Sequence, residues 1–317
     1  MKVSCVIITH NRVDMLKRAV NSVMNQTYKN IEIFVVDDAS SDGTENYGKE
    51  LINKGINYIR IDAKDSKGGN YARNIGINES TGEYVAFLDD DDYWLPEKIE
   101  KQVIYAEEHR DVGMIYSGLA YEYDNKCLNY KSLPNPEYQG DLIEKELFIS
   151  PFASTITLFV KRDILQKIGG FDVNMRYWQE YELEIRLMQI TLVGFVPEIL
   201  AVANRQGTVK RLTSQYDNWE LSVDYLNKKH EQLFSGLSDK MKKRKTEYYY
   251  REAAYRVSAV GDKKRMREFY KKAYSINPKL EYRVRCILGL SKDDTIFVES
   301  CIRKIIYVRT ERKYKHS

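Results

Sequence analysis

The sequence predicts an α/β protein in which a largely parallel sheet covered by helices precedes a mostly helical C-terminal region. Short β-branched runs alternate with segments of helical period from residue 3 to about residue 119. After about residue 205 the β signals nearly vanish, and helical patterns rich in Tyr, Lys and Arg follow. A chain of 317 residues has room for two domains. We therefore expect one domain over 1–205 and a basic helical region over 206–317.

The first half of the expected domain has the pattern of a βαβ array. The expected strands are residues 3–9, 31–37, 58–61, 84–88 and 112–117. Residues 13–26 carry apolar side chains at helical spacing, and residues 41–44 supply capping residues for a second helix. In open parallel sheets, ligands bind beyond the carboxyl ends of the strands, where Thr9, Asp37 and the aspartates of 89–92 stand. We expect these side chains to meet at one edge of the sheet.

The segments that follow are less regular. Residues 153–160 predict a strand, Gly169-Gly170 a turn, 180–190 a helix and 194–202 a further strand. Near the C-terminus, two helical patterns flank Gly261-Asp262 and predict a helical hairpin that weakly resembles one tetratricopeptide unit. Such a unit cannot bury its own apolar face, so it must pack on other helices, on the first domain or on another copy of the chain. A homo-oligomer through the helical region is thus left open.

Charge is distributed unevenly, although the formal net charge is only +4. Residues 1–204 carry 22 Lys and Arg against 32 Asp and Glu, whereas residues 205–317 carry 28 against 14. This asymmetry indicates a cation-using acidic body joined to a basic region that suits an anionic membrane surface. A basic surface that contacts solvent alone is an equally weighted alternative. Nucleic acid is not an expected partner, because no nucleic-acid-binding module accompanies the charge.

The cysteine pattern and the apolar runs favour a cytoplasmic location. Cys5, Cys127, Cys286 and Cys301 stand in no ligand spacing, so neither a disulfide framework nor a zinc site is expected. No apolar run has the length of a spanning helix, and no signal-peptide pattern follows Met1. Isoleucines interleaved with cations over 302–315 suit an interfacial helix, which would place the protein peripherally on the cytoplasmic membrane face.

The strongest local feature is the run Asp89-Asp90-Asp91-Asp92, which follows an apolar strand. Four successive carboxylates repel one another unless a cation or solvent compensates, and hard divalent metals take oxygen ligands of this kind. A metal–diphosphate site is one interpretation. The other is a solvated acidic turn that caps the helix beginning near Pro96.

Two further segments suit a nucleotide. Asp37-Asp38 ends a buried strand, where a carboxylate can accept a hydrogen bond from a ring N–H or a ribose hydroxyl, although helix capping by neighbouring residues is also expected. Gly68-Gly69 precedes a helix with Arg73 one turn in, which is a weak phosphate-binding signal. The chain has no complete dinucleotide-binding or P-loop motif here, which argues against dehydrogenases and P-loop enzymes.

A carboxylate also stands in the first turn of the expected helix over 180–190. Glu180 follows the aromatic Trp178 and shares a helix face with Leu183 and Leu187, so an inward-facing stripe would carry it into a cleft. A general base needs such a position. The alternative is a glutamate favoured by the helix dipole alone.

Together these segments resemble the inverting glycosyltransferase family 2, whose catalytic domain has the GT-A fold. The resemblance covers residues 1 to about 205 and rests on the order and spacing of four motifs. They are residues 6–12 (Val-Ile-Ile-Thr-His-Asn-Arg), 36–40 (Val-Asp-Asp-Ala-Ser), the aspartate run, and 169–172 (Gly-Gly-Phe-Asp) followed by Gln179-Glu180.

For the donor, the resemblance implies a UDP-sugar. Thr9 and Asn11 would line the nucleotide pocket, Asp38 would bind the uracil edge, and Arg73 would brace the pocket. The Asp-x-Asp motif of the family falls on residues 89–91. Asp90 would face the ribose or the sugar, with Asp89 beside it, and Asp91 would bind Mg²⁺ or Mn²⁺ at the diphosphate.

For the acceptor, the resemblance implies a catalytic base in the Gln179-Glu180 pair, where the family usually has Glu-Asp. We carry the role to Glu180, with Glu182 as its competitor, and expect Trp178 to contact the acceptor. Arg211 would belong to a loop over 205–211 that closes on the diphosphate; an electrostatic linker is the alternative.

The sequence thus predicts an inverting, metal-dependent glycosyltransferase, a hexosyl- or N-acetylhexosaminyl-transferase, of cell-surface polysaccharide biosynthesis. It would move a sugar from a UDP-sugar to a hydroxyl of a saccharide or lipid-linked acceptor. The alternative is a noncatalytic subunit of a synthesis complex that binds a nucleotide sugar or a glycan.

Overall fold

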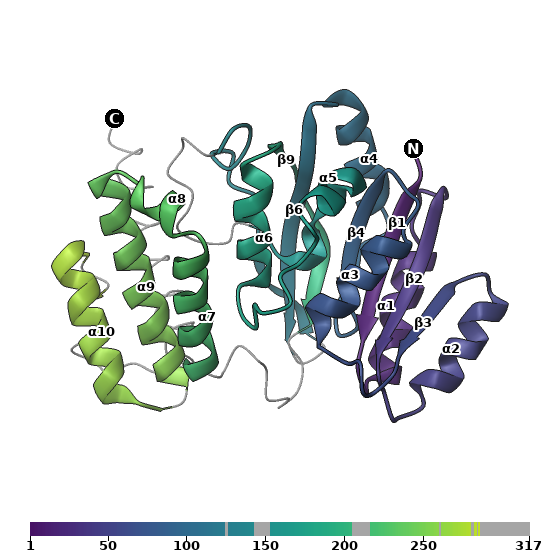
Figure 1. The fold of residues 1–317 in the computed structure, drawn as a ribbon, viewed down its shortest axis with the longest axis horizontal. Coiled ribbons are helices and arrows are strands. Elements are labelled where there is room, and N and C mark those ends of the chain that lie inside the picture. Colours follow the sequence, from purple (N-terminus) through teal and green to yellow (C-terminus); the bar gives the residue numbers. More distant parts are fainter. Residues whose placement is uncertain are drawn as a thin grey trace. The chain divides into compact units, whose positions relative to one another are not determined.

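The computed structural model describes residues 1–123, 126–142, 153–204, 216–259, 261–279, 282, 283 and 285. The chain divides into two compact units, Met1–Val209 and Lys210–Ser317, which are described separately (Figure 1).

A nine-stranded mixed sheet forms the centre of the first unit. Its strands are β1 (Val3–Thr9), β2 (Ile31–Asp38), β3 (Asn57–Ile61), β4 (Tyr84–Asp89), β5 (Tyr93–Trp94), β6 (Val112–Tyr123), β7 (Lys126–Ser132), β8 (Phe159–Lys161) and β9 (Leu192–Asn204). They lie in the order β3-β2-β1-β4-β8-β6-β9-β5, and β7 pairs with β6. The helices of this unit are α1 (Val13–Met24), α2 (Thr44–Asn53), α3 (Gly69–Glu79), α4 (Lys98–Glu108), α5 (Arg162–Lys167) and α6 (Gln179–Met188), with a 3₁₀ turn, η1, at Thr155–Thr157.

The parallel part of the sheet fixes where polar side chains meet. Strand β1 pairs in parallel with β2 on one side and β4 on the other, and β2 pairs in parallel with β3. In this register Thr9 lies opposite Asp37, and Ile8 lies opposite Asp89. The carboxyl ends of three strands therefore form one edge, as the sequence predicts.

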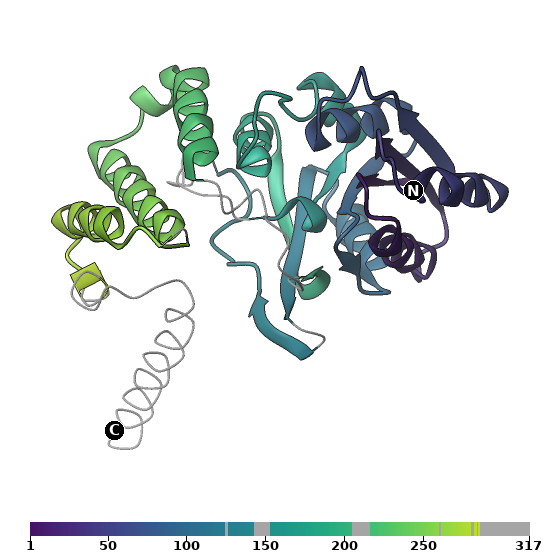
Figure 2. The same cartoon turned by 90° about the horizontal axis from the view of Figure 1, so that it is seen from below.

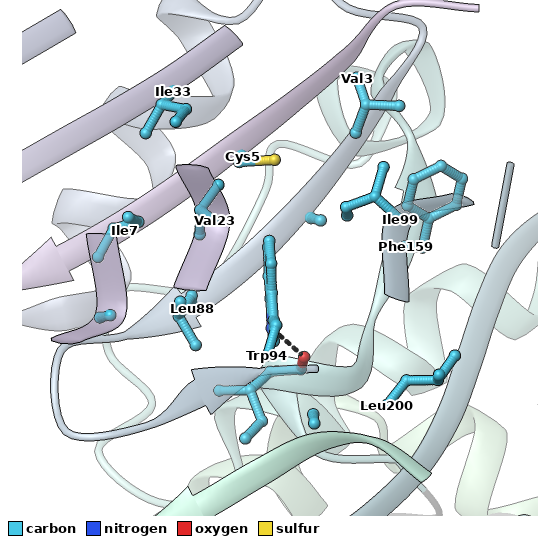
Figure 3. Packing of buried hydrophobic residues seen from close by; sticks show 14 of the residues in the cluster. Val3, Cys5, Ile7, Val23, Ile33, Leu88, Trp94, Ile99, Phe159 and Leu200 are labelled. Carbon is cyan, nitrogen blue, oxygen red and sulfur yellow. Dashed lines mark hydrogen bonds between the residues drawn. The ribbon is translucent and has the colours of Figure 1, made fainter. Parts of the chain in front are cut away.

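Apolar residues cover both faces of β1, as expected for a parallel sheet between helices. Val3, Cys5 and Ile7 belong to a buried cluster with residues of α1 and α4 (Figure 3). On the other face Val6 packs so closely on α3 that a Cβ at Gly76 would lie 2.3 Å from it. Trp94 lies in the same cluster near β9, and its indole Nε1 donates to the carbonyl of Ile156 at 2.9 Å (Figure 3).

The expected strands agree with the structure except over 153–160, where that expectation is wrong. A capping box between Ser154 and Thr157 turns the backbone into η1, so only Phe159–Lys161 pairs as β8. Strand β6 is longer than expected because its pairing with β9 continues to Glu122.

The second unit is helical, with α7 (Tyr216–Lys229), α8 (Glu231–Ser235), α9 (Asp239–Ala259) and α10 (Lys263–Ile276). Helices α9 and α10 pack along each other (Figure 2), as the hairpin prediction requires, and Gly261 takes a left-handed conformation (φ +81°) in the turn between them. Aromatic rings contact one another around the buried Tyr216 and Trp219. They are Tyr216, Trp219, Tyr249, Tyr250 and Phe269. Over the described ranges of the chain, no helix combines the length and the apolar character needed to cross a membrane.

Candidate active site

Three aspartates at the end of β4 form a cluster that can hold a cation. Asp89, Asp91 and Asp92 each offer one carboxylate oxygen, and these oxygens lie within 4.8 Å of one another. All three side chains are partly exposed. The turn is fixed by the backbone of Asn204, whose N–H donates to Asp92 Oδ1 at 2.9 Å. Oxygen donors at this spacing fit a hard divalent ion such as Mg²⁺ or Mn²⁺.

The fourth aspartate, Asp90, points into the protein instead. Its side chain is 5% exposed. Oδ2 accepts from Thr9 Oγ1 at 2.8 Å and from the His10 N–H at 3.3 Å, and Oδ1 accepts from Arg12 Nη1 at 2.9 Å. Burial raises the pKa of Asp90 to about 6, against the lowering effect of Arg12. A ribose or sugar contact stays a prediction for Asp90, and in the structure both of its oxygens anchor the loop.

Two arginines compensate the charge of the aspartate turn. Arg12 Nη1 also lies 3.3 Å from Asp91 Oδ2. Arg18 Nη2, from α1, donates to the backbone carbonyl of Asp91 at 2.6 Å. The turn is therefore held in place by cations of the protein itself, while the three remaining carboxylates point to the same region.

A second carboxylate, Asp38 at the end of β2, has an unsatisfied oxygen. Asp38 is 8% exposed. Its Oδ2 accepts from the Gly68 N–H at 3.1 Å, whereas its buried Oδ1 has no hydrogen-bond partner. A buried acceptor left open in this way costs free energy unless a ligand supplies a donor. The site is thus prepared for an N–H or O–H group.

Two loops next to Asp38 are locked to each other in strained conformations. Asn11 and Ala39 both have positive φ (56° and 61°), which is uncommon for residues other than glycine. The Asn11 N–H donates to Ser40 Oγ at 2.8 Å, and Asn11 Oδ1 accepts from the Ser41 N–H at 2.6 Å. His10 Nδ1 donates to the Asp38 carbonyl at 2.6 Å. Asn11 therefore shapes this edge through the loop that it holds.

Helix α3 joins the aspartate turn to the Gly-Gly-Phe-Asp segment. Arg73 is 4% exposed, and its Nη2 lies 2.6 Å from Asp89 Oδ1. One turn earlier, Asn70 Nδ2 donates to the carbonyls of Asp172 and Met175 at 2.8 Å each. Asn74 Oδ1 accepts from the Phe171 N–H at 2.7 Å. The chain leading to α6 is thus pinned to the helix that holds Asp89.

Glu180 is the second residue of α6 and is half-buried. Trp178, which caps this helix, has φ +54° and ψ +33°. The residue is 9% exposed and its ring contacts Tyr181 edge-on at 5.6 Å between centroids, so little of Trp178 is open to an acceptor. A left-handed tryptophan is a pronounced backbone outlier, and such outliers concentrate at functional sites.

Glu182, the competitor for the role of base, is enclosed. Its carboxylate is fully buried, and its Oε1 accepts from Arg186 Nε at 2.8 Å. Arg186 Nη1 donates in turn to the Ile168 carbonyl at 2.8 Å. A carboxylate shielded from solvent in this way cannot receive the proton of an incoming hydroxyl.

The structure brings most of the predicted residues to one edge of the sheet. Thr9, Asn11, Asp38, Arg73, Asp89, Asp90 and Asp91 all lie at or directly behind the ends of β1, β2 and β4. Arg211 lies outside the described residues. The sequence analysis included Asp92 in the aspartate run and Arg12 in the 6–12 motif without giving either an individual role, and it gave no role to Arg18.

Comparison with known proteins decides the family. Residues 4–169 match the family described as Glycosyl transferase family 2. The chain belongs to this family. An uncharacterized glycosyltransferase of Methanocaldococcus jannaschii is 30% identical over 236 residues, which cover 72% of this chain and 81% of that protein. One of Rickettsia prowazekii is 29% identical over 244 residues, covering 74% and 75%. Matches to relatives from Rickettsia typhi and Nostoc span 62% and 57% of those proteins.

Solved structures confirm the GT-A fold of this family 2 glycosyltransferase. Staphylococcus aureus TarS 1–349 in complex with UDP-GlcNAc superposes with a TM-score of 0.56 at 16% identity, covering 91% of this chain and 89% of that one. The mannosyltransferase PcManGT of Pyrobaculum calidifontis, in complex with GDP-Man and Mn²⁺, gives a TM-score of 0.57 at 15% identity, covering 91% and 84%. The protein is thus a glycosyltransferase whose structural neighbours bind nucleotide sugars.

Proposed function

We propose that this glycosyltransferase is inverting and metal-dependent, and that it transfers a sugar from UDP to a hydroxyl of a saccharide or lipid-linked acceptor in cell-surface polysaccharide biosynthesis. The observation that carries the proposal is the cluster of Asp89, Asp91 and Asp92 at the sheet edge that also bears the open oxygen of Asp38. The diphosphate and the uracil ring of one nucleotide can then bind side by side, because the strands that carry the two sets of carboxylates, β4 and β2, both flank β1.

Asp38 and the aspartate cluster bind the donor, and Arg73 orients the cluster. Asp38 Oδ1 accepts from the N3–H of uracil, which supplies the missing hydrogen-bond donor. Asp91 and its neighbours Asp89 and Asp92 hold Mn²⁺ or Mg²⁺, which when bound offsets the charge that builds up on the UDP leaving group. Arg73 keeps Asp89 oriented through its 2.6 Å ion pair. The neighbours that carry UDP-GlcNAc or GDP-Man and Mn²⁺ support a nucleotide sugar and a divalent ion.

Glu180 acts as the catalytic base. It takes the proton of the acceptor hydroxyl as that oxygen attacks the anomeric carbon from the side opposite UDP, so a single displacement inverts the centre. Its half-buried position at the start of α6 lets it face both protein and substrate, while Glu182 is committed to Arg186. Trp178 borders the acceptor through its fixed backbone, and the role of Arg211 at the diphosphate stays a prediction.

The second unit binds the anionic surface of the cytoplasmic membrane. Exposed cations cover the outer face of α10, with Glu268 as the one exposed acid on that helix: Lys263, Lys264, Arg265, Arg267, Lys271 and Lys272. The opposite stripe, with Met266, Tyr270 and Ala273, is buried. Each cation near an anionic surface contributes about 1 kcal/mol. The tail over 302–315 would add an interfacial segment.

The first experiment measures UDP release from a panel of UDP-sugars with Mn²⁺ and a membrane extract as acceptor. Wild type is compared with Asp91→Ala, Glu180→Gln and the exposed control Glu83→Gln. Turnover of one sugar by the wild type and the control, lost in the other two variants while UDP still binds Glu180→Gln, supports donor, metal and base together. Binding of UDP without turnover of any sugar would contradict the catalytic proposal and favour a noncatalytic binding subunit.

Membrane binding is tested by flotation with phosphatidylglycerol and phosphatidylcholine vesicles. We expect salt-sensitive flotation with the anionic vesicles alone, reduced at least tenfold by charge reversal at Lys263, Lys264 and Lys271. Reversal of Lys49 and Lys54 in the acidic unit is the matched control and should leave flotation unchanged. Flotation that ignores both salt and the α10 substitutions would contradict the proposal.

A further inference from the structure

We propose that Arg60, on the edge strand β3, is the positioning residue that holds the turn carrying Asp38 in its base-binding conformation. This inference rests on the proposed contact between Asp38 and uracil. It concerns the residues behind that contact, which no motif in the sequence marks.

The turn begins at Asp37, whose carboxylate is fully buried and accepts hydrogen bonds at both oxygens. Asp37 Oδ1 accepts from the Ser40 N–H at 2.9 Å. Asp37 Oδ2 accepts from the Tyr58 hydroxyl at 2.6 Å and from Arg60 Nη1 at 2.9 Å. Both partners of Oδ2 come from β3, so the edge strand holds the start of the turn.

Arg60 also holds the end of the turn. Its Nη2 donates to the Ser40 carbonyl at 2.8 Å. One planar guanidinium thus bridges Asp37 and Ser40, and the two residues between these points are Asp38 and the left-handed Ala39. A lysine has a single donor centre and cannot span the two acceptors with the same geometry.

The bridge matters for binding because the turn is strained. Ala39 keeps φ at +61° only while its surroundings enforce it. Relaxation of Ala39 would rotate the neighbouring peptide and shift Asp38, whose carboxylate is held, among the described residues, only by the Gly68 N–H at Oδ2 and has no partner at Oδ1. A fixed oxygen binds a ring N–H more tightly than one that must first be ordered. Arg60 therefore contributes to both the affinity for uracil and its selection.

The test compares UDP and CDP binding by calorimetry in the wild type, Arg60→Lys and Asp38→Asn, with kcat measured at saturating donor. Uracil presents a donor at N3 and cytosine an acceptor, so the UDP/CDP ratio reports on the orientation of Asp38. We expect Arg60→Lys to weaken UDP binding about 3- to 10-fold and to lower the UDP/CDP ratio to a similar extent, with kcat unchanged.

Arg162→Lys is the matched control. Arg162 also bridges two backbone carbonyls, donating from Nε to Gly82 at 3.0 Å and from Nη1 to Ser80 at 3.3 Å, but it does so at the amino end of β4. We expect it to lower Tm without changing the UDP/CDP ratio. If the UDP/CDP ratio is lost in Asp38→Asn but retained in Arg60→Lys, the inference about Arg60 is wrong while the contact between Asp38 and uracil stands. If the wild type does not prefer UDP over CDP, the proposed contact between Asp38 and uracil is wrong, and so is the inference about Arg60.

Discussion

The two edges of one sheet are built in opposite ways. At the amino ends of β1, β2 and β4, Glu32 accepts hydrogen bonds from Ser4, Thr81 and Gly82 and pairs with Lys2 at 2.6 Å. At the carboxyl ends, like charges cluster, Asp38 keeps an open oxygen, and two residues hold left-handed backbones. At the amino ends of these strands the carboxylate of Glu32 has several hydrogen-bond partners, whereas at the carboxyl ends one buried oxygen of Asp38 has none among the described residues.

The titration of the two edges shows the same contrast. Burial tends to raise the pKa of Glu32, but hydrogen bonds from Lys2, Ser4 and Thr81 outweigh it and lower the pKa to about 2. Burial raises the pKa of Asp90 to about 6 in spite of Arg12. Hydrogen bonds that stabilise a partly buried carboxylate add to the stability of the fold. An unsatisfied or strained group costs stability, and a ligand that satisfies it gains binding free energy. The amino edge therefore contributes to stability, whereas the carboxyl edge has the features expected of a binding site.

The largest expected effect comes from removing one charge at each edge. Asp91→Asn should lower kcat/KM for UDP release by about 100- to 1000-fold, because an oxygen ligand of the cation is weakened. Glu32→Gln should leave kcat/KM unchanged and lower the free energy of unfolding instead. Both variants are measured by UDP release and urea unfolding. Loss of activity in Glu32→Gln without loss of stability would contradict the assignment of Glu32 to stability alone.

An added methyl group separates the edges sterically. A Cβ at Gly82 would lie 2.8 Å from the backbone at Lys2 O and Ser4 N, so Gly82→Ala should destabilise the protein by about 1–3 kcal/mol with UDP affinity retained. At Gly43, near the carboxyl edge, the nearest atom is 3.7 Å away. Gly43→Ala is therefore the control, with an expected change within about 1 kcal/mol in urea unfolding.

Acid should remove stability at the amino edge. The pKa of Glu32 is lowered in the fold, so its contribution is complete above the unfolded pKa of about 4.5 and is lost as the pH falls toward about 2. Solvent screening limits this contribution to about 1–2 kcal/mol. Urea unfolding between pH 6 and pH 2.5 should show a smaller loss of stability in Glu32→Gln than in the wild type. Parallel curves would contradict this assignment.

The smallest expected effect is at Ala39. Glycine relieves the left-handed conformation but adds freedom to the unfolded chain, so Ala39→Gly should change the free energy of unfolding by less than about 1 kcal/mol. Ala86→Gly, in the buried interior of β4, should cost about 1.5 kcal/mol by comparison. Equal losses in urea unfolding would mean that Ala39 is not strained.

Much of the fold follows from the sequence because local signals agree there with tertiary structure. Over residues 3–89, β-branched runs and apolar helical periods coincide with the observed strands and helices. The prediction over 153–160 fails because its β-branched residues favour a strand, whereas local hydrogen bonds of Ser154 and Thr157 select a 3₁₀ turn.

The arrangement of the candidate site was predictable where its residues are adjacent in sequence, as in the aspartate run. It was not predictable where residues distant in sequence cooperate. Arg18 reaches the Asp91 carbonyl across 73 positions, and Arg60 contacts Asp37 from another strand. Nor does the sequence distinguish the inward-turned Asp90 from its partly exposed neighbours, since that depends on Thr9 and Arg12.

The pairing of β5 with β9 has a consequence for synthesis of the protein on the ribosome. Tyr93 pairs with Val202 and Trp94 with Ala201, and Asp92 is held by the N–H of Asn204. The aspartate turn is thus translated more than one hundred residues before the strand that fixes it. A nascent chain that ends before residue 192 contains all four aspartates but lacks that support. The aspartate cluster is therefore completed late during translation, when the last strand of the sheet emerges.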